Sequence, residues 1–104
     1  MAIKVQTEFI DAASVRIITY VYNAAGKLED ATGLTIDIYD PDGTLTIDGV
    51  AMDNQGTGIY DYYYHKGATS AAMASGRWRG IVLVTDGAGA TAVISAGTFS
   101  FKVK

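Results

Sequence analysis

Three aspartates in a short stretch, Asp37, Asp40 and Asp42, have the residue type and the spacing that could bind a metal ion. Hard cations such as Ca²⁺ collect several carboxylate and carbonyl oxygens from one short loop. The run Asp-x-x-Asp-x-Asp-Gly matches such a loop only in part, because the distal bidentate Glu is absent. The segment 40–43, Asp-Pro-Asp-Gly, also meets every requirement of a plain turn. The sequence therefore predicts a turn, with calcium binding as the alternative, and no metal or cofactor beyond that.

A tyrosine-rich segment could recognise a sugar, since flat rings stack on pyranose faces and hydroxyl tips bond to sugar hydroxyls. Alternation along a strand places Tyr60, Tyr62 and Tyr64 on one face. That face is predicted to be core, with an exposed recognition role as the alternative. Tyr63 and Tyr39 are the better candidates for exposed ligand-binding residues.

Arg77 and Arg79 flank Trp78 and could bind a carboxylate or an aromatic ring. Their alternative role is to face solvent beside an inward-pointing tryptophan. No further pattern points to a small molecule, so a small-molecule ligand is not expected.

The chain contains few residues that could act in catalysis. The single histidine, His65, ends the tyrosine-rich strand, and no serine lies in a nucleophile-elbow motif. A nucleophile with its base, or paired carboxylates in a cleft, cannot be assembled from these patterns. The prediction is a protein that is not an enzyme and has no catalytic residues.

The composition of the chain limits the classes of partner that it is expected to bind. The net charge is −3, which argues against a nucleic-acid surface, because such surfaces carry a basic stripe. Charged residues make up 18% and apolar residues 49%, so part of the surface is neutral or covered by another chain. The chain has no cysteine, no signal-peptide pattern and no apolar run long enough for a membrane span. A cytoplasmic place of folding and no membrane partner are expected.

The length of 104 residues predicts one domain over residues 1–104. Turn-forming residues separate short alternating segments, which predicts an all-β, antiparallel β-sandwich of about seven strands. Turns are expected at 23–26, 40–43, 48–49, 53–56 and 86–89, and the division of 44–52 has two solutions. At most one short helical turn is expected, near residues 69–75. The predicted strands are Ile3–Phe9, Val15–Tyr22, Leu34–Tyr39, Thr44–Ile47, Val50–Met52, Gly58–His65, Arg77–Thr85 and Thr91–Val103.

Two of these strands are apolar on both faces. The second face of 15–22 carries Ile18, Tyr20 and Tyr22, and that of 77–85 carries Ile81 and Leu83. Central strands with some apolar outer surface are one interpretation. The other is a contact face for a neighbouring subunit.

Three strand motifs follow one another in the chain: a Gly-x-Tyr-x-Tyr strand, a Gly-x-aromatic strand ending in Asp-Gly, and a terminal Phe-x-Phe-x-Val strand. Their residues are Gly58, Tyr60, Tyr62, Gly76, Trp78, Asp86, Gly87, Phe99, Phe101 and Val103. The order of these motifs resembles the prokaryotic and phage immunoglobulin-like domains over nearly the whole chain. The resemblance implies an immunoglobulin-like sandwich that serves adhesion, decoration or assembly rather than catalysis. Within that group the chain is most similar to a small virion component, which implies a location in the virion or the cytoplasm.

The main functional hypothesis is therefore a repeated component of a larger assembly, such as a phage head decoration or tail-associated protein. Its partners would be other protein subunits, as a homo-oligomer or larger assembly. Contact would bury the apolar outer faces, with edge-strand pairing by the N-terminal segment. The alternative is a carbohydrate- or cell-surface-binding module that uses exposed aromatic residues.

Overall fold

The computed structural model describes residues 2–11, 14–65, 74–87, 89 and 92–103. These residues form eight β-strands and no α-helix. The strands are β1 (Ala2–Asp11), β2 (Ser14–Tyr22), β3 (Gly33–Tyr39), β4 (Leu45–Ala51), β5 (Asp53–Gly56), β6 (Ile59–His65), β7 (Gly76–Asp86) and β8 (Val93–Val103). The predicted helical turn falls mainly on residues 69–73, which lie outside the described residues; Ala74 and Ser75 belong to no helix.

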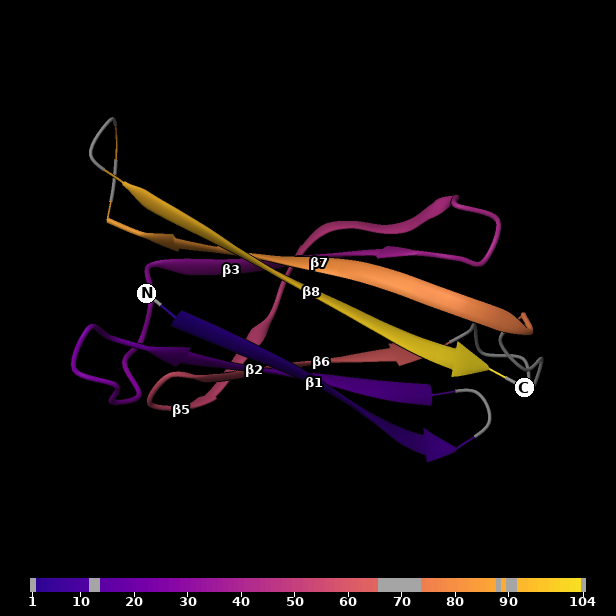
Figure 1. The fold of residues 1–104 in the computed structure, drawn as a ribbon, viewed down its shortest axis with the longest axis horizontal. Helices are drawn as coiled ribbons and strands as arrows, with labels where there is room; N and C mark the ends of the chain where they lie inside the picture. Colours follow the sequence, from indigo (N-terminus) through magenta and orange to yellow (C-terminus); the bar gives the residue numbers. More distant parts are fainter. Residues whose placement is uncertain (1, 12–13, 66–73, 88, 90–91, 104) are drawn as a thin grey trace.

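The strands build two antiparallel sheets of four strands, which face each other as two layers (Figure 1). The first sheet has the order β1-β2-β6-β5 and the second β4-β3-β7-β8. The prediction of an all-β, antiparallel sandwich is confirmed, with eight strands instead of about seven. An immunoglobulin-like arrangement stays a prediction.

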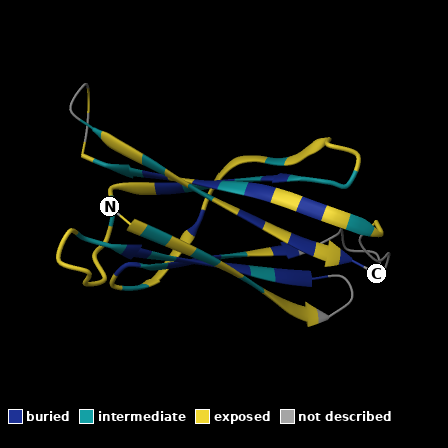
Figure 2. Ribbon diagram, viewed as in Figure 1, coloured by how far each residue is buried: buried dark blue, intermediate teal, exposed yellow. Residues whose placement is uncertain are grey.

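The core lies between the layers, and alternation along each strand determines which side chains enter it. Figure 2 shows the resulting alternation of buried and exposed positions along β7 and β8. Inward-facing members of the core include Val15, Ile17, Val21, Leu34, Ile36, Ile38, Tyr60, Tyr64, Trp78, Val82, Val84, Phe99 and Phe101.

Four aromatic residues of the core, Tyr64, Trp78, Phe99 and Phe101, are joined by ring contacts. The ring of Trp78 stacks on Phe101 with centroids 5.9 Å apart, and Tyr64 lies 5.5 Å from Trp78 in a tilted arrangement. Tyr60 and Tyr64 are buried, and Tyr62 packs against the core from its rim. The assignment of this tyrosine face to the core is confirmed.

A turn predicted at Asp48-Gly49 is wrong. Residues 45–51 form the single strand β4, whose register against β3 shifts at this point, so that two residues oppose Asp37 alone. This is a β-bulge. Gly49 adopts a φ of 60°, and its N–H donates to Asp37 Oδ1 at 2.6 Å. A β-bulge needs a residue with positive φ, as a turn does, and the glycine of the Asp-Gly pair supplies it.

A turn predicted at 53–56 is also wrong, since these residues form the edge strand β5. The chain changes sheets at Met52, whose N–H bonds to Leu34 O while β5 begins one residue later. The turn between β5 and β6 lies at Thr57-Gly58 instead. Polar residues at a sheet edge have the same composition as a turn, which explains the error.

The segment that crosses from β2 to β3 packs directly on Gly58. A Cβ atom at this position would lie 2.7 Å from Glu29 N and 2.8 Å from Val21 O. Asp30 Oδ1 accepts the Gly58 N–H at 2.6 Å and Asn54 Nδ2 at 3.2 Å. Gly58 is thus one of the points where the crossing segment is fixed to the first sheet, together with Tyr60, whose hydroxyl bonds to Ala31.

Candidate functional site

A pocket of about 880 Å³ lies on the outer face of the second sheet, beside the turn between β3 and β4. It brings together three of the four predicted ligand-binding residues with one predicted interface residue. Its lining includes Tyr39, Asp40, Pro41, Asp42, Arg77, Arg79, Ile81, Thr98 and Ser100.

Strand register explains this gathering. Tyr39 of β3 lies opposite Arg79 of β7, which lies opposite Ser100 of β8. In the adjacent row on the same face, Ile81 lies opposite Thr98. Hydroxyl groups, guanidinium groups and one aromatic ring therefore share a single surface, where they could bind a polar or anionic group.

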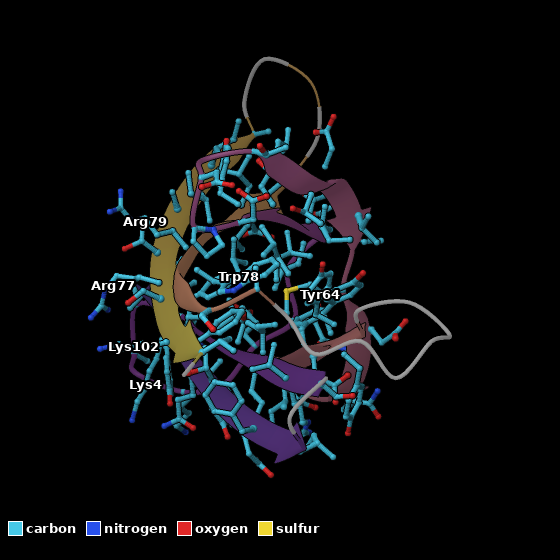
Figure 3. All side chains as sticks on the ribbon, turned by 90° about the vertical axis from the view of Figure 1, so that its right-hand side faces the viewer. Lys4, Tyr64, Arg77, Trp78, Arg79 and Lys102 are labelled. Carbon is cyan, nitrogen blue, oxygen red and sulfur yellow. The ribbon has the colours of Figure 1, made fainter. Side chains whose placement is uncertain are left out.

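Arg77 and Arg79 form the cationic side of the pocket, and Lys102 lies next to it on β8. Arg77 lies directly opposite Lys102, and its Nη1 donates to Ser100 Oγ at 3.1 Å. No carboxylate among the described residues lies within 4.0 Å of these three cations. Figure 3 shows all three projecting from one side, together with Lys4. This is a local excess of positive charge on a chain of net charge −3.

Two of the three aspartates, Asp37 and Asp40, accept backbone N–H groups through their carboxylates. Asp40 Oδ1 accepts the N–H groups of Asp42 and Thr44 at 3.0 and 2.9 Å, and the Gly43 N–H bonds to Asp40 O at 3.0 Å. Asp37 holds the β4 bulge, as described above. The predicted turn at 40–43 is confirmed, and the described residues contain no group of three or more acidic, His or Cys residues able to hold a metal ion.

Tyr63 lies on the opposite side of the molecule from Tyr39. It belongs to the outer face of the first sheet, where it is 45% exposed and opposite Arg16, whose guanidinium carbon lies 5.8 Å from the ring centroid. The two tyrosines proposed as exposed recognition residues therefore do not form one platform.

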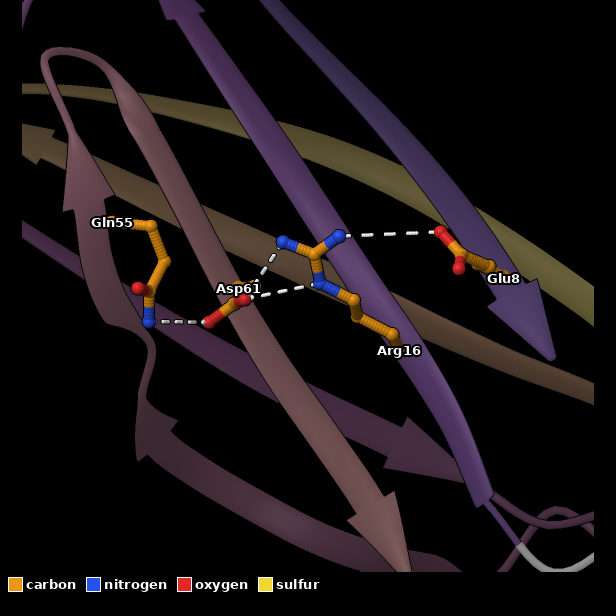
Figure 4. A network of polar contacts seen from close by, with 4 residues as sticks. All are labelled: Glu8, Arg16, Gln55 and Asp61. Atoms are coloured by element: carbon orange, nitrogen blue, oxygen red, sulfur yellow. Dashed lines mark hydrogen bonds and ion pairs between the residues drawn. The ribbon is translucent and has the colours of Figure 1, made fainter. Parts of the chain in front are cut away.

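A polar network crosses the outer face of the first sheet through Asp61 (Figure 4). Asp61 Oδ2 accepts bonds from Arg16 Nε and Nη2 at 3.1 and 3.0 Å, and Oδ1 accepts from Gln55 Nε2 at 3.0 Å. Arg16 Nη1 also lies 4.0 Å from Glu8 Oε2. The four side chains come from β1, β2, β5 and β6 and so join the whole sheet.

Sequence reasoning missed this network, because an aspartate on the outer face of a strand is ordinarily solvated. The Asp61 side chain is instead covered by its neighbours, and the residue is 2% exposed. The only sequence signal was the presence of an arginine on the outer face of another strand. Hydrogen bonding to Asp61 raises the pKa of Arg16 above its ordinary value.

The Asp61→Ala substitution should lower the free energy of unfolding by about 2 kcal/mol, because it removes the charged acceptor of three hydrogen bonds. Denaturation by urea measures the change. Asp53→Ala is the control, since Asp53 is exposed and lies opposite Asp61 on the neighbouring strand. Equal effects of the two substitutions would mean that the network does not stabilise the fold.

The two sets of predicted interface residues lie on opposite outer faces. Ile18, Tyr20 and Tyr22 belong to the first sheet, where Ile18 is only 6% exposed because its neighbours cover it. Ile81 and Leu83 belong to the second sheet, and Leu83 is 39% exposed. The second set is therefore the more accessible for contact.

Comparisons with family models, curated proteins and solved structures found no match to this chain. None of the described residues forms a helix that could span a lipid bilayer.

Proposed function

We propose that this protein is a non-enzymatic, immunoglobulin-like structural protein that acts as a repeated component of a larger assembly, such as a phage virion. Its partners are other protein subunits, including copies of itself. The observation that carries the proposal is a strip of low charge around the exposed Leu83, on the outer face of the second sheet.

This strip crosses three strands and has little charge. Leu83 lies between Thr35 and Ala96 in one row, and Ile81 lies between Asp37 and Thr98 in the next. Asp37 is the only charged residue in these two rows, and its carboxylate already accepts the Gly49 N–H. A neutral sheet surface with a large exposed leucine loses little hydration when another protein covers it.

Strand order supports the immunoglobulin-like part of the proposal. Constant-type immunoglobulin domains have the strands A, B, E and D in one sheet and C, F and G in the other. With β4 counted as an additional strand C′, the orders β1-β2-β6-β5 and β4-β3-β7-β8 correspond to ABED and C′CFG. Domains of this architecture commonly present their faces, edges and loops to protein partners.

The Leu83→Asp substitution should weaken assembly by roughly tenfold or more, because contact would bury an unpaired carboxylate. The fold should persist, since Leu83 is not a core residue. Light scattering over a wide concentration range measures the assembly, and Ile81→Asp should act in the same direction. Thr46→Asp, at an exposed position of β4, is the control. Normal assembly of the Ile81→Asp, Leu83→Asp double variant would refute the proposed contact face.

The alternative function, a carbohydrate- or cell-surface-binding module, has narrower support. It depends on the pocket beside Tyr39, Arg77 and Arg79, because Tyr63 faces the other way. Only one aromatic ring of the expected pair is then available to a sugar at that pocket.

A further inference from the structure

The four edge strands of the sandwich differ in how well they are protected from pairing with another chain. An unpaired edge exposes a row of N–H and C=O groups, which proteins blunt with short strands, bulges, prolines or charges. β5 has four residues, and β4 is interrupted where its register shifts against β3. β1 carries Lys4 and Glu8 and has a register shift near its end.

β8 has only one of these devices, a single charged residue near its end. It has eleven residues and no proline, and it pairs with β7 along its whole length without a shift in register. Lys102, next to its last residue, is its one charged side chain. Ile94, at its other end, is 67% exposed, more than any other large hydrophobic residue among the described residues.

β1 lies beside β8 but does not cover its edge. A Cβ atom at Gly97 would lie 2.9 and 3.0 Å from the side chains of Ile3 and Val5, so β1 packs against the core side of β8. Among the described strands β1 is hydrogen-bonded only to β2, and β8 only to β7. β1 thus contacts the core side of β8, and the outer edge of β8 pairs with none of the described strands.

We propose that β8 pairs antiparallel with β8 of a second copy across a two-fold axis, joining the two second sheets into one continuous eight-stranded sheet. This names the partner and adds a second contact surface, distinct from the strip around Leu83, to the assembly proposed above, and it rests on that proposed function. Full overlap of the two strands places Thr98, the central residue, opposite Thr98 of the other copy.

This register suits the side chains. Residues of the outer face meet residues of the outer face, as the pleat requires. Lys102 lies opposite Ile94 of the other copy, so like charges stay apart and the lysine stem covers the exposed isoleucine. Ser100 lies opposite Ala96 of the other copy. Thr98 lies opposite Thr98 of the other copy, which places two hydroxyl groups side by side at the axis. The side chains that face each other in this register are therefore compatible, and a second copy of the chain fits the β8 edge.

The test uses opposite charges at the axis. Thr98→Lys and Thr98→Asp should each reduce the native mass from a dimer, or a multiple of it, to half that value, because like charges would lie directly opposite. An equimolar mixture of the two variants should restore the wild-type mass. Sedimentation measures the masses, and Thr46→Lys, at the opposite edge of the same sheet, is the control.

A cross-link provides a second measurement. Because the chain has no cysteine, Thr98→Cys introduces a single thiol. Opposed Cα atoms in antiparallel strands are about 4.5 or 5.5 Å apart, within the range of a disulfide. Oxidation should therefore convert Thr98→Cys, but not Thr46→Cys, into a covalent dimer.

The outcomes separate this proposal from the proposed function. If the wild type self-associates but neither charge at residue 98 changes its mass, the edge proposal is wrong and the assembly function stands. If the wild type is a single chain at every concentration, both are wrong. Loss of association in each variant without recovery in the mixture would overturn the two-fold register.

Discussion

The Trp78→Ala variant should lose about 4 kcal/mol of unfolding free energy, a large share of the 5–15 kcal/mol that stabilises a typical small domain. Trp78 is 1% exposed and stacks on Phe101, so its removal leaves a cavity among rigid rings. The substitution also leaves Ala74 O without the indole donor, which now bonds to it at 3.0 Å. Urea denaturation followed by far-ultraviolet circular dichroism measures the loss.

The matched control is Leu83→Ala on the same strand. Leu83 faces outward and belongs to no core cluster, so its truncation should cost less than about 1 kcal/mol. If both variants lost the same stability, the assignment of inward and outward faces on β7 would be wrong.

Gly58→Ala should lose more than about 2 kcal/mol of unfolding free energy. The residue has a φ of 70°, which an alanine adopts at a cost of about 1–2 kcal/mol. The new Cβ would also collide with Glu29 N and Val21 O, which are backbone atoms that no side-chain rotation can clear. Thermal and urea denaturation measure the effect.

Gly43→Ala separates these two costs. Gly43 has a φ of 86°, but a Cβ there would meet nothing within 4 Å. Its substitution should therefore show the backbone cost alone, and the difference between the two variants should report the collision. Equal losses would mean that the crossing segment moves away from Gly58 without penalty.

The sequence contained enough information to predict the layers of this fold, because burial in a sandwich follows strict alternation. Tyr60 and Tyr64 were placed in the core on that basis, as was Trp78. Turns were less predictable. Asp-Gly at 48–49 and the polar run 53–56 have turn composition, but cross-strand pairing with β3 and β6 makes them a bulge and an edge strand.

The individual residues of the candidate site could be predicted from the sequence, but not which of them lie close together. Tyr39, Arg77 and Arg79 were identified from residue type, yet only the register of β3 on β7 brings them to one pocket. The assignment of β6 to the other sheet is what separates Tyr63 from them. Asp61 was missed because its burial arises from side chains on neighbouring strands, which no pattern within one strand reveals.

The enclosed position of Trp78 has a spectroscopic consequence. It is the only tryptophan of the chain, so the intrinsic emission has a single indole source. Emission from the apolar interior should be blue-shifted and should move to longer wavelength when water reaches the ring. Association at the β8 edge leaves the indole enclosed, so its emission wavelength should not change. One sample can thus report folding through the wavelength of its fluorescence and assembly through its anisotropy, without an added label.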